Sequence, residues 1–267
     1  MYRGGVSPTT REITSEEFLG VVADPHRWRL LAALAASDRR VGELTGLTGA
    51  PQSLVSYHLA QLKAGGLISA RRSSADGRDT YYRADIARCD ELFAQASASL
   101  HPGLRLVPAS LAPVRRRGGR KPRVLFLCTG NSARSQIAEA LLESRSGGTI
   151  EARSAGSHPK VLHPSAVRVM AERGVGISGR PTKHLSRFTR SRFDRVITLC
   201  DKVKEICPEF PGQPALAHWS MADPAAGSDD DYDATYPAFI RTADEIDQRV
   251  GLLMAQLADT NPPEEHT

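Results

Sequence analysis

A proline- and arginine-rich segment, residues 101–122, divides the chain into two parts with different hydrophobic periodicity. It holds four prolines and a basic run: Pro102, Pro108, Pro113, Pro122 and residues 115–121. Its proline and glycine content argues against a packed element, so we expect a linker. The basic run is either a solvated tether or a non-specific contact for phosphates. A chain of 267 residues is long enough for one domain on each side.

Before the linker, residues 14–100 carry a helical pattern that is interrupted once by strand-like runs. Asp24 and Pro25 predict a helix start, with Asp24 as the N-cap and Pro25 in the first turn. The expected helices cover residues 24–35, 41–47, 51–64 and 86–100. Two β-prone runs, 67–72 and 80–83, flank Asp76-Gly77 and predict a hairpin. This order is typical of a winged helix-turn-helix, an α+β fold.

After the linker, residues 123–260 alternate between short apolar runs and helical patterns. The expected strands cover residues 124–127, 149–152, 195–199 and 217–221. The expected helices cover residues 136–142, 164–172 and 236–257. Alternation of this kind predicts an α/β domain, with a parallel sheet between helices.

The net charge of +5 is spread unevenly along the chain. Residues 1–123 hold 19 Lys and Arg against 11 Asp and Glu, whereas residues 124–267 hold 16 against 19. A basic half suggests a nucleic-acid partner, although a general preference for arginine explains the same charge. No run approaches the roughly 18–20 apolar residues of a membrane span, and Met1–Thr10 lacks the apolar core of a secretory leader. We therefore expect a cytoplasmic protein that makes no membrane contact.

An eight-residue loop, 128–135, lies between a buried-type strand and a helix, with a cysteine and an arginine separated by five residues. Backbone N–H groups in such a loop can converge on a tetrahedral oxyanion, and Arg134 can hold two of its oxygens. The same positive surroundings are expected to lower the pKa of Cys128 and make it a nucleophile. The expected oxyanion ligands are Thr129, Gly130, Asn131, Ser132, Ala133, Arg134 and Ser135. The alternative is a buried cysteine in an ordinary turn.

Residues 123 to about 259 resemble the low-molecular-weight protein tyrosine phosphatase family, and most closely its thioredoxin-coupled arsenate reductase branch. The run Cys-Thr-Gly-Asn-Ser-Ala-Arg-Ser-Gln-Ile-Ala-Glu, which begins at Cys128, carries the resemblance. It implies a four-stranded parallel sheet flanked by helices. It also implies that Asp223, in the pair Asp223-Pro224, is a general acid over the pocket. By itself this pair indicates only a turn.

The chain has four cysteines, Cys89, Cys128, Cys200 and Cys207, which are too few for a disulfide scaffold. The last three match the positions and spacing of the relay in the reductase branch. The resemblance thus implies reduction of arsenate to arsenite, with no bound cofactor and with a thioredoxin-like reductant as partner. Two structural cysteines or half of a zinc site are the alternatives, but the four closely spaced ligands of zinc are absent, so we expect no metal. A phosphatase or an oxyanion-sensing regulator also remains possible.

Some reductases of this branch bind potassium through an Asn, a Glu, a Ser and an Asp. Asn131, Glu139 and Ser154 match the first three, but Lys183 stands at the aspartate position. We expect the lysine ammonium to replace the cation, and activity to be independent of potassium. In the alternative, Lys183 points to solvent.

Residues 16 to about 98 resemble the ArsR-type winged-helix repressors, through residues 24–31, 52–59 and 63–67. The resemblance implies a homodimer, formed through terminal helices, that binds double-stranded DNA with the helix after Pro51 in the major groove. The expected DNA contacts are Gln52, Ser53, Ser56, Tyr57 and His58 on this helix, and Arg71, Arg72, Arg78 and Arg83 on the wing. The alternative is a module for dimerisation alone. Cys89 is the only thiol here, so we expect a core residue and no metal sensing.

Overall fold

The computed structural model describes residues 13–104, 120–226 and 232–258. The chain forms two compact units, Met1–Pro108 and Ala109–Thr267. Most of the predicted linker, residues 105–119, lies outside the described residues, and residues 102–104 form a short 3₁₀ turn, η1 (Pro102–Leu104). Within the described part of the chain, no helix is both long and apolar enough to span a membrane.

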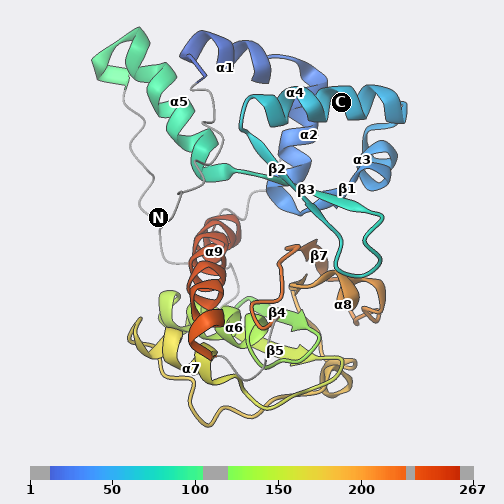
Figure 1. The fold of residues 1–267 in the computed structure, drawn as a ribbon, viewed down its shortest axis with the longest axis vertical. Coiled ribbons are helices and arrows are strands. Elements are labelled where there is room, and N and C mark those ends of the chain that lie inside the picture. Colours follow the sequence, from blue (N-terminus) through green and yellow to red (C-terminus); the bar gives the residue numbers. More distant parts are fainter. Residues whose placement is uncertain (1–12, 105–119, 227–231, 259–267) are drawn as a thin grey trace, which may run out of the picture. The chain divides into compact units, whose positions relative to one another are not determined.

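The N-terminal unit is a winged helix-turn-helix, as predicted (Figure 1). Its elements are α1 (Ser15–Val22), α2 (Pro25–Ala36), β1 (Arg39–Arg40), α3 (Val41–Thr48), α4 (Gln52–Ala64), β2 (Ile68–Arg72), β3 (Thr80–Ala84) and α5 (Ile86–Leu100). The antiparallel strands β2 and β3 form the expected hairpin. Strand β1 was not predicted. It pairs with β3, which places the residues before α3 on the same small sheet.

Local chemistry sets the helix ends of this unit. The carboxylate of Asp24 accepts hydrogen bonds from the backbone N–H groups of His26 and Arg27, at 2.9 and 3.0 Å. Gly49 ends α3 with a φ of 65°, a left-handed conformation that favours glycine. Helix α4 then packs its apolar stripe on α2 and α3, through Val55, Leu59 and Leu62. The opposite face of α4 is left exposed.

The C-terminal unit is built on a four-stranded parallel sheet with the order β5-β4-β6-β7. In chain order its elements are β4 (Arg123–Cys128), α6 (Arg134–Arg145), β5 (Glu151–Gly156), α7 (Pro164–Ala171), η2 (Leu185–Phe188), β6 (Arg195–Thr198), α8 (Asp201–Glu205), β7 (Ala215–His218) and α9 (Tyr232–Ala258). This confirms the predicted α/β class. The last strand begins two residues earlier than expected. Helix α9 packs against α6 and α7 (Figure 1).

Strand β4 lies inside the sheet, between β5 and β6. Its residues Val124, Leu125, Phe126 and Leu127 have no exposed surface, as expected for a parallel strand that is covered on both faces. The carboxyl ends of β4 and β6 lie side by side at one edge of the sheet. Sites of α/β proteins lie at this edge, where Cys128 is the last residue of β4 and Cys200 follows the end of β6.

Candidate active site

The loop that begins at Cys128 is held against the end of β5. Asn131 in this loop has a φ of 47°, in the left-handed region that an asparagine tolerates. Gly156, at the end of β5, faces the loop so closely that a Cβ there would lie 2.6 Å from the Thr129 carbonyl oxygen. Any larger residue would displace the loop. Sequence reasoning missed Gly156, because the predicted strand ended at residue 152, whereas β5 extends to Gly156.

The Cys128 thiol lies at the centre of this loop and is 2% exposed. Its sulfur accepts a hydrogen bond from the Asn131 backbone N–H at 3.2 Å, and it lies 2.9 Å from the Ser135 hydroxyl. Burial raises the pKa of the Cys128 thiol, while the Arg134 guanidinium and the Ser135 hydrogen bond act in the opposite direction. The predicted lowering of this pKa is therefore wrong, because desolvation outweighs the positive surroundings in this structure.

Arg134 connects the loop with the segment after β7. Its guanidinium is almost completely buried, donates from Nη1 to the Met221 carbonyl at 3.1 Å, and lies 3.1 Å from the Asp223 carboxylate through Nη2. Half of the Asp223 side chain is exposed, so this carboxylate lies at the mouth of the site. The structure thus brings Cys128, Arg134 and Asp223 together from segments almost 90 residues apart.

Two further thiols lie on the segment that follows β6. Cys200 is 2% exposed, and its sulfur lies 3.2 Å from the Thr129 hydroxyl, so it faces the loop. Cys207 lies beyond α8, is half-buried, and packs against the core. Burial raises the pKa of Cys207 to about 11. All four cysteines are free thiols in this structure.

A buried polar cluster supports the loop from the side of α6. The Lys183 ammonium lies 2.9 and 3.2 Å from the two carboxylate oxygens of Glu139, and the Ser154 hydroxyl donates to the same carboxylate. The Asn131 amide donates to Ser154 at 2.8 Å and to Ser135 at 2.9 Å. The Asn131 amide oxygen accepts the Lys183 backbone N–H at 2.7 Å. These contacts fix the loop conformation around Cys128.

The structure decides between the two alternatives for Lys183, an ammonium beside Glu139 or a side chain in solvent. Its side chain is 12% exposed and is paired with Glu139, so it does not point to solvent. The ammonium already occupies the position beside the carboxylate, so these residues do not fit a potassium ion. Among the described residues, no group of three or more His, Cys, Asp or Glu side chains is arranged to hold a metal.

In the N-terminal unit, four of the five predicted contacts on α4 are exposed: Gln52, Ser53, Ser56 and Tyr57. His58 is 5% exposed, and its ring stacks on His26 and faces Asp24 at 3.8 Å. The predicted DNA contact by His58 is therefore wrong, because this side chain lies on the buried face of α4. On the wing, Arg72 and Arg78 are exposed, whereas Arg71 and Arg83 are half-buried.

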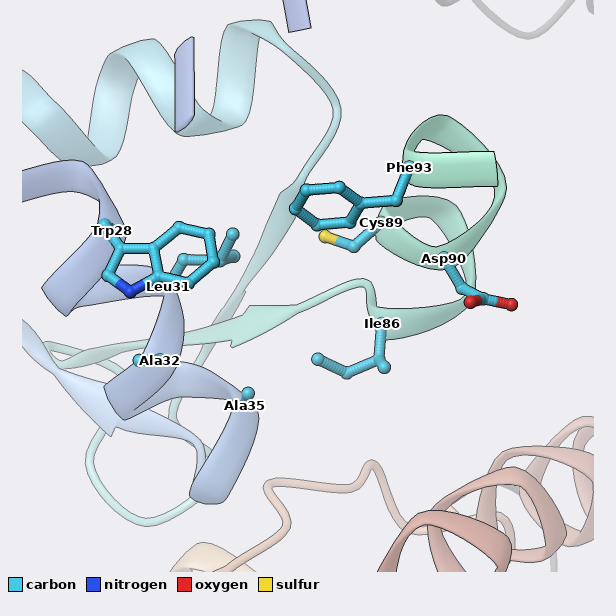
Figure 2. A pocket seen from close by; sticks show the side chains of 8 residues that line it. All are labelled: Trp28, Leu31, Ala32, Ala35, Ile86, Cys89, Asp90 and Phe93. Carbon is cyan, nitrogen blue, oxygen red and sulfur yellow. The ribbon is translucent and has the colours of Figure 1, made fainter. Parts of the chain in front are cut away.

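Cys89 lies in the core between α2 and α5. Figure 2 shows its sulfur beside Phe93, on the wall of an apolar cavity of about 280 Å³ that Trp28 and Leu31 also line. Burial raises the pKa of Cys89 to about 11, which disfavours the thiolate that binds metals. The burial and the raised pKa support the expectation of a core residue.

Two family models match the chain. One, "Low molecular weight phosphotyrosine protein phosphatase", covers residues 123–262, and the other, "Bacterial regulatory protein, arsR family", covers residues 24–70. A relative named arsenate reductase from Halalkalibacterium halodurans is 35% identical over 127 residues, which are 48% of this chain and 91% of the relative. An arsenate reductase from Brevibacillus brevis is 35% identical over 130 residues, which are 49% of this chain and 92% of the relative.

Solved structures are also similar to this chain. One is described as an arsenate reductase in the phosphate binding state, with 30% identity and a TM-score of 0.45 over 51% of this chain and 98% of that chain. Another is an arsenate reductase from Archaeoglobus fulgidus, with 30% identity and a TM-score of 0.40 over 49% of this chain and 98% of that chain.

Proposed function

The chain belongs to the low molecular weight phosphotyrosine protein phosphatase family and carries an arsR-family helix-turn-helix domain, and from this premise we propose that it reduces arsenate to arsenite and regulates transcription. The observation that carries the reductase proposal is the position of Cys200. Its thiol faces the loop that holds Cys128, where a hydrolytic phosphatase needs no second thiol. The names of the two relatives point in the same direction.

Binding of substrate uses the loop and its arginine. Arsenate is a tetrahedral oxyanion, and the N–H groups of residues 129–135 together with the Arg134 guanidinium form the donors for its oxygens. Cys128 attacks arsenic as the thiolate, and the Asn131 N–H and Ser135 hydroxyl stabilise negative charge on its sulfur. One arsenate oxygen leaves as water after Asp223 has protonated it. The product is a Cys128–arsenic bond.

Reduction follows in two thiol exchanges. The Cys200 thiolate attacks the sulfur of Cys128, and the electron pair of the sulfur–arsenic bond passes to arsenic, which leaves as arsenite. The Cys207 thiolate then attacks Cys200, and Cys128 is released as the thiolate. A Cys200–Cys207 disulfide remains, and an external dithiol of the thioredoxin type reduces it. No bound cofactor enters the cycle.

The helix-turn-helix domain adds a second activity, binding to double-stranded DNA. The exposed face of α4 offers Gln52, Ser53, Ser56 and Tyr57 to base edges or phosphates. Arg72 at the end of β2 and Arg78 in the hairpin turn are exposed and can lie beside phosphates. Arg71 and Arg83 are half-buried and belong to the same wing. We further propose a homodimer formed by the N-terminal unit.

A single-turnover experiment tests the relay. The Cys207→Ser protein should release one arsenite per enzyme and stop with a Cys128–Cys200 disulfide, whereas Cys200→Ser should release none. The matched control is Cys89→Ser, which should turn over like the unchanged protein because this thiol lies in the other unit. Sustained turnover by Cys207→Ser would refute the relay. Aryl phosphate hydrolysis without any arsenite would favour the phosphatase alternative.

A further inference from the structure

A buried hydrogen-bond cluster directly follows Cys200 and has no part in the steps described so far. Asp201, the first residue of α8, has no exposed surface. Its Oδ1 accepts the Ser220 hydroxyl at 2.7 Å and lies 3.1 Å from His218 Nε2. On the other side of the ring, His218 Nδ1 lies 2.8 Å from the Thr198 hydroxyl. The cluster therefore joins the ends of β6 and β7 to the start of α8.

A buried carboxylate is costly unless it is paired and hydrogen-bonded. Asp201 is hydrogen-bonded to Ser220 and lies beside His218, and it is too deep to meet solvent. What it does fix is the backbone next to Cys200. The sulfur of Cys200 must stay beside the loop for the attack on Cys128, and its present contact is the Thr129 hydroxyl at 3.2 Å.

The other end of the same segment is more exposed. Val203 is buried, but Glu205 and Ile206 are exposed, and Cys207 is half-buried. Cys200 and Cys207 lie on either side of α8, whose 5 residues alone span about 7.5 Å at about 1.5 Å per residue. The Cα atoms of a disulfide lie about 5.5–6 Å apart. Formation of the second disulfide therefore requires α8 to unwind.

We propose that Asp201 is a positioning residue that keeps Cys200 beside the loop. Its carboxylate is held by His218 and Ser220, while residues 202–207 unwind and bring Cys207 to Cys200. This inference rests on the proposed thiol relay. Because Asp201 holds the backbone next to Cys200, the thiol that moves is that of Cys207. Loss of the Asp201 carboxylate lets Cys200 drift, and displacement of a reacting group by about 1 Å can cost about a hundredfold in rate.

The test uses the full chain with Cys207→Ser, which stops the reaction at the Cys128–Cys200 disulfide. The rate at which this disulfide forms is measured with two different oxidants. In the first arm the oxidant is arsenate, which takes up the electron pair of the sulfur–arsenic bond and is reduced to arsenite. In the second, hydrogen peroxide oxidises Cys128 to a sulfenic acid and is reduced to water, and Cys200 then displaces a second water from that sulfur. The peroxide arm requires neither arsenate chemistry nor Asp223.

We expect Asp201→Ala to slow disulfide formation by about a hundredfold in both arms. Asp201→Asn keeps an acceptor oxygen for Ser220, so its loss should be roughly tenfold or less. Ser220→Ala is a milder variant that removes one donor and should give a smaller loss. The matched control is Lys202→Ala, an exposed position on the same helix, which should leave the rate unchanged.

Protection of Cys128 from iodoacetamide by inorganic phosphate reports whether the loop is intact, and it should be the same in all these variants. Disulfide formation at the control rate in Asp201→Ala or Ser220→Ala would overturn the proposal. So would a loss of phosphate protection that parallels the loss of rate, since the cluster would then support the fold in general. A disulfide that forms with peroxide but not with arsenate in the Cys207→Ser protein would refute arsenate reduction and still decide the role of Asp201.

Discussion

Replacement of Lys183 by methionine should destabilise the C-terminal unit, because it leaves the Glu139 carboxylate buried without its cation. The ammonium lies 2.9 Å from Glu139, and the two side chains are 12% and 6% exposed. Removal of one partner from a buried pair costs about 3–5 kcal/mol. The pair here is not fully buried, and Ser154 still donates to Glu139, so we expect the lower end, about 3 kcal/mol. For a domain of this size the melting temperature should fall by roughly 6–12 °C.

The assay is urea unfolding followed by the fluorescence of Trp219, in a background in which Trp28→Phe removes the other tryptophan. Adding Glu139→Gln to Lys183→Met removes the unpaired charge, and should restore more than half of the lost free energy of unfolding. The control is Arg153→Met, which breaks a surface pair with Glu151 whose side chains are 40% and 31% exposed, and should cost about 1 kcal/mol or less. A loss below about 1 kcal/mol for Lys183→Met, or a double variant no more stable than the single one, would show that Lys183 does not replace a cation.

Three further outcomes follow from the same geometry. Arsenate reduction should proceed at equal rates in potassium and sodium chloride because Lys183 supplies the positive charge, and a strong increase with potassium would contradict this role. Burial raises the pKa of Cys207 to about 11, and only the thiolate attacks. Formation of the Cys200–Cys207 disulfide should therefore accelerate about tenfold per pH unit from pH 6 to 8, and a flat profile would exclude the Cys207 thiolate as the attacking group. On DNA duplexes selected from a random library, Gln52→Ala should weaken binding to the selected sequences only, by about 1–3 kcal/mol. Arg78→Ala should weaken binding to all sequences alike and reduce its salt dependence. The same uniform loss of affinity in both variants would exclude Gln52 from base recognition.

The features of this protein that could be predicted are those that depend on residues close together in the sequence. The loop 128–135 lies between a fully apolar strand and a helix, so its place at the edge of the sheet followed from eight residues and their neighbours. The cap at Asp24 and the left-handed glycine at Gly49 also depend only on adjacent residues. For this reason the helix-turn-helix and the strand–helix alternation could be recognised before the structure.

The parts that were wrong or missed depend on contacts distant in the sequence. Strand β1 exists because its residues pair with β3, about 40 positions later. The pKa of Cys128 depends on how completely the assembled site excludes water, which no local pattern states. The Asp201–His218 contact joins two segments 17 residues apart. His58 is different, because the stripe of Val55, Leu59 and Leu62 already places it on the buried side of α4, and its polar character misled the prediction.

The central claim is that the C-terminal unit reduces arsenate with three thiols. The most direct measurement is arsenate-dependent NADPH consumption by the full chain with thioredoxin and thioredoxin reductase, with aryl phosphate hydrolysis measured in parallel. The account predicts consumption by the unchanged protein and none by Cys128→Ser or Cys207→Ser. Absence of consumption, with aryl phosphate hydrolysis intact, would contradict the claim and leave Cys200 and Cys207 without a role.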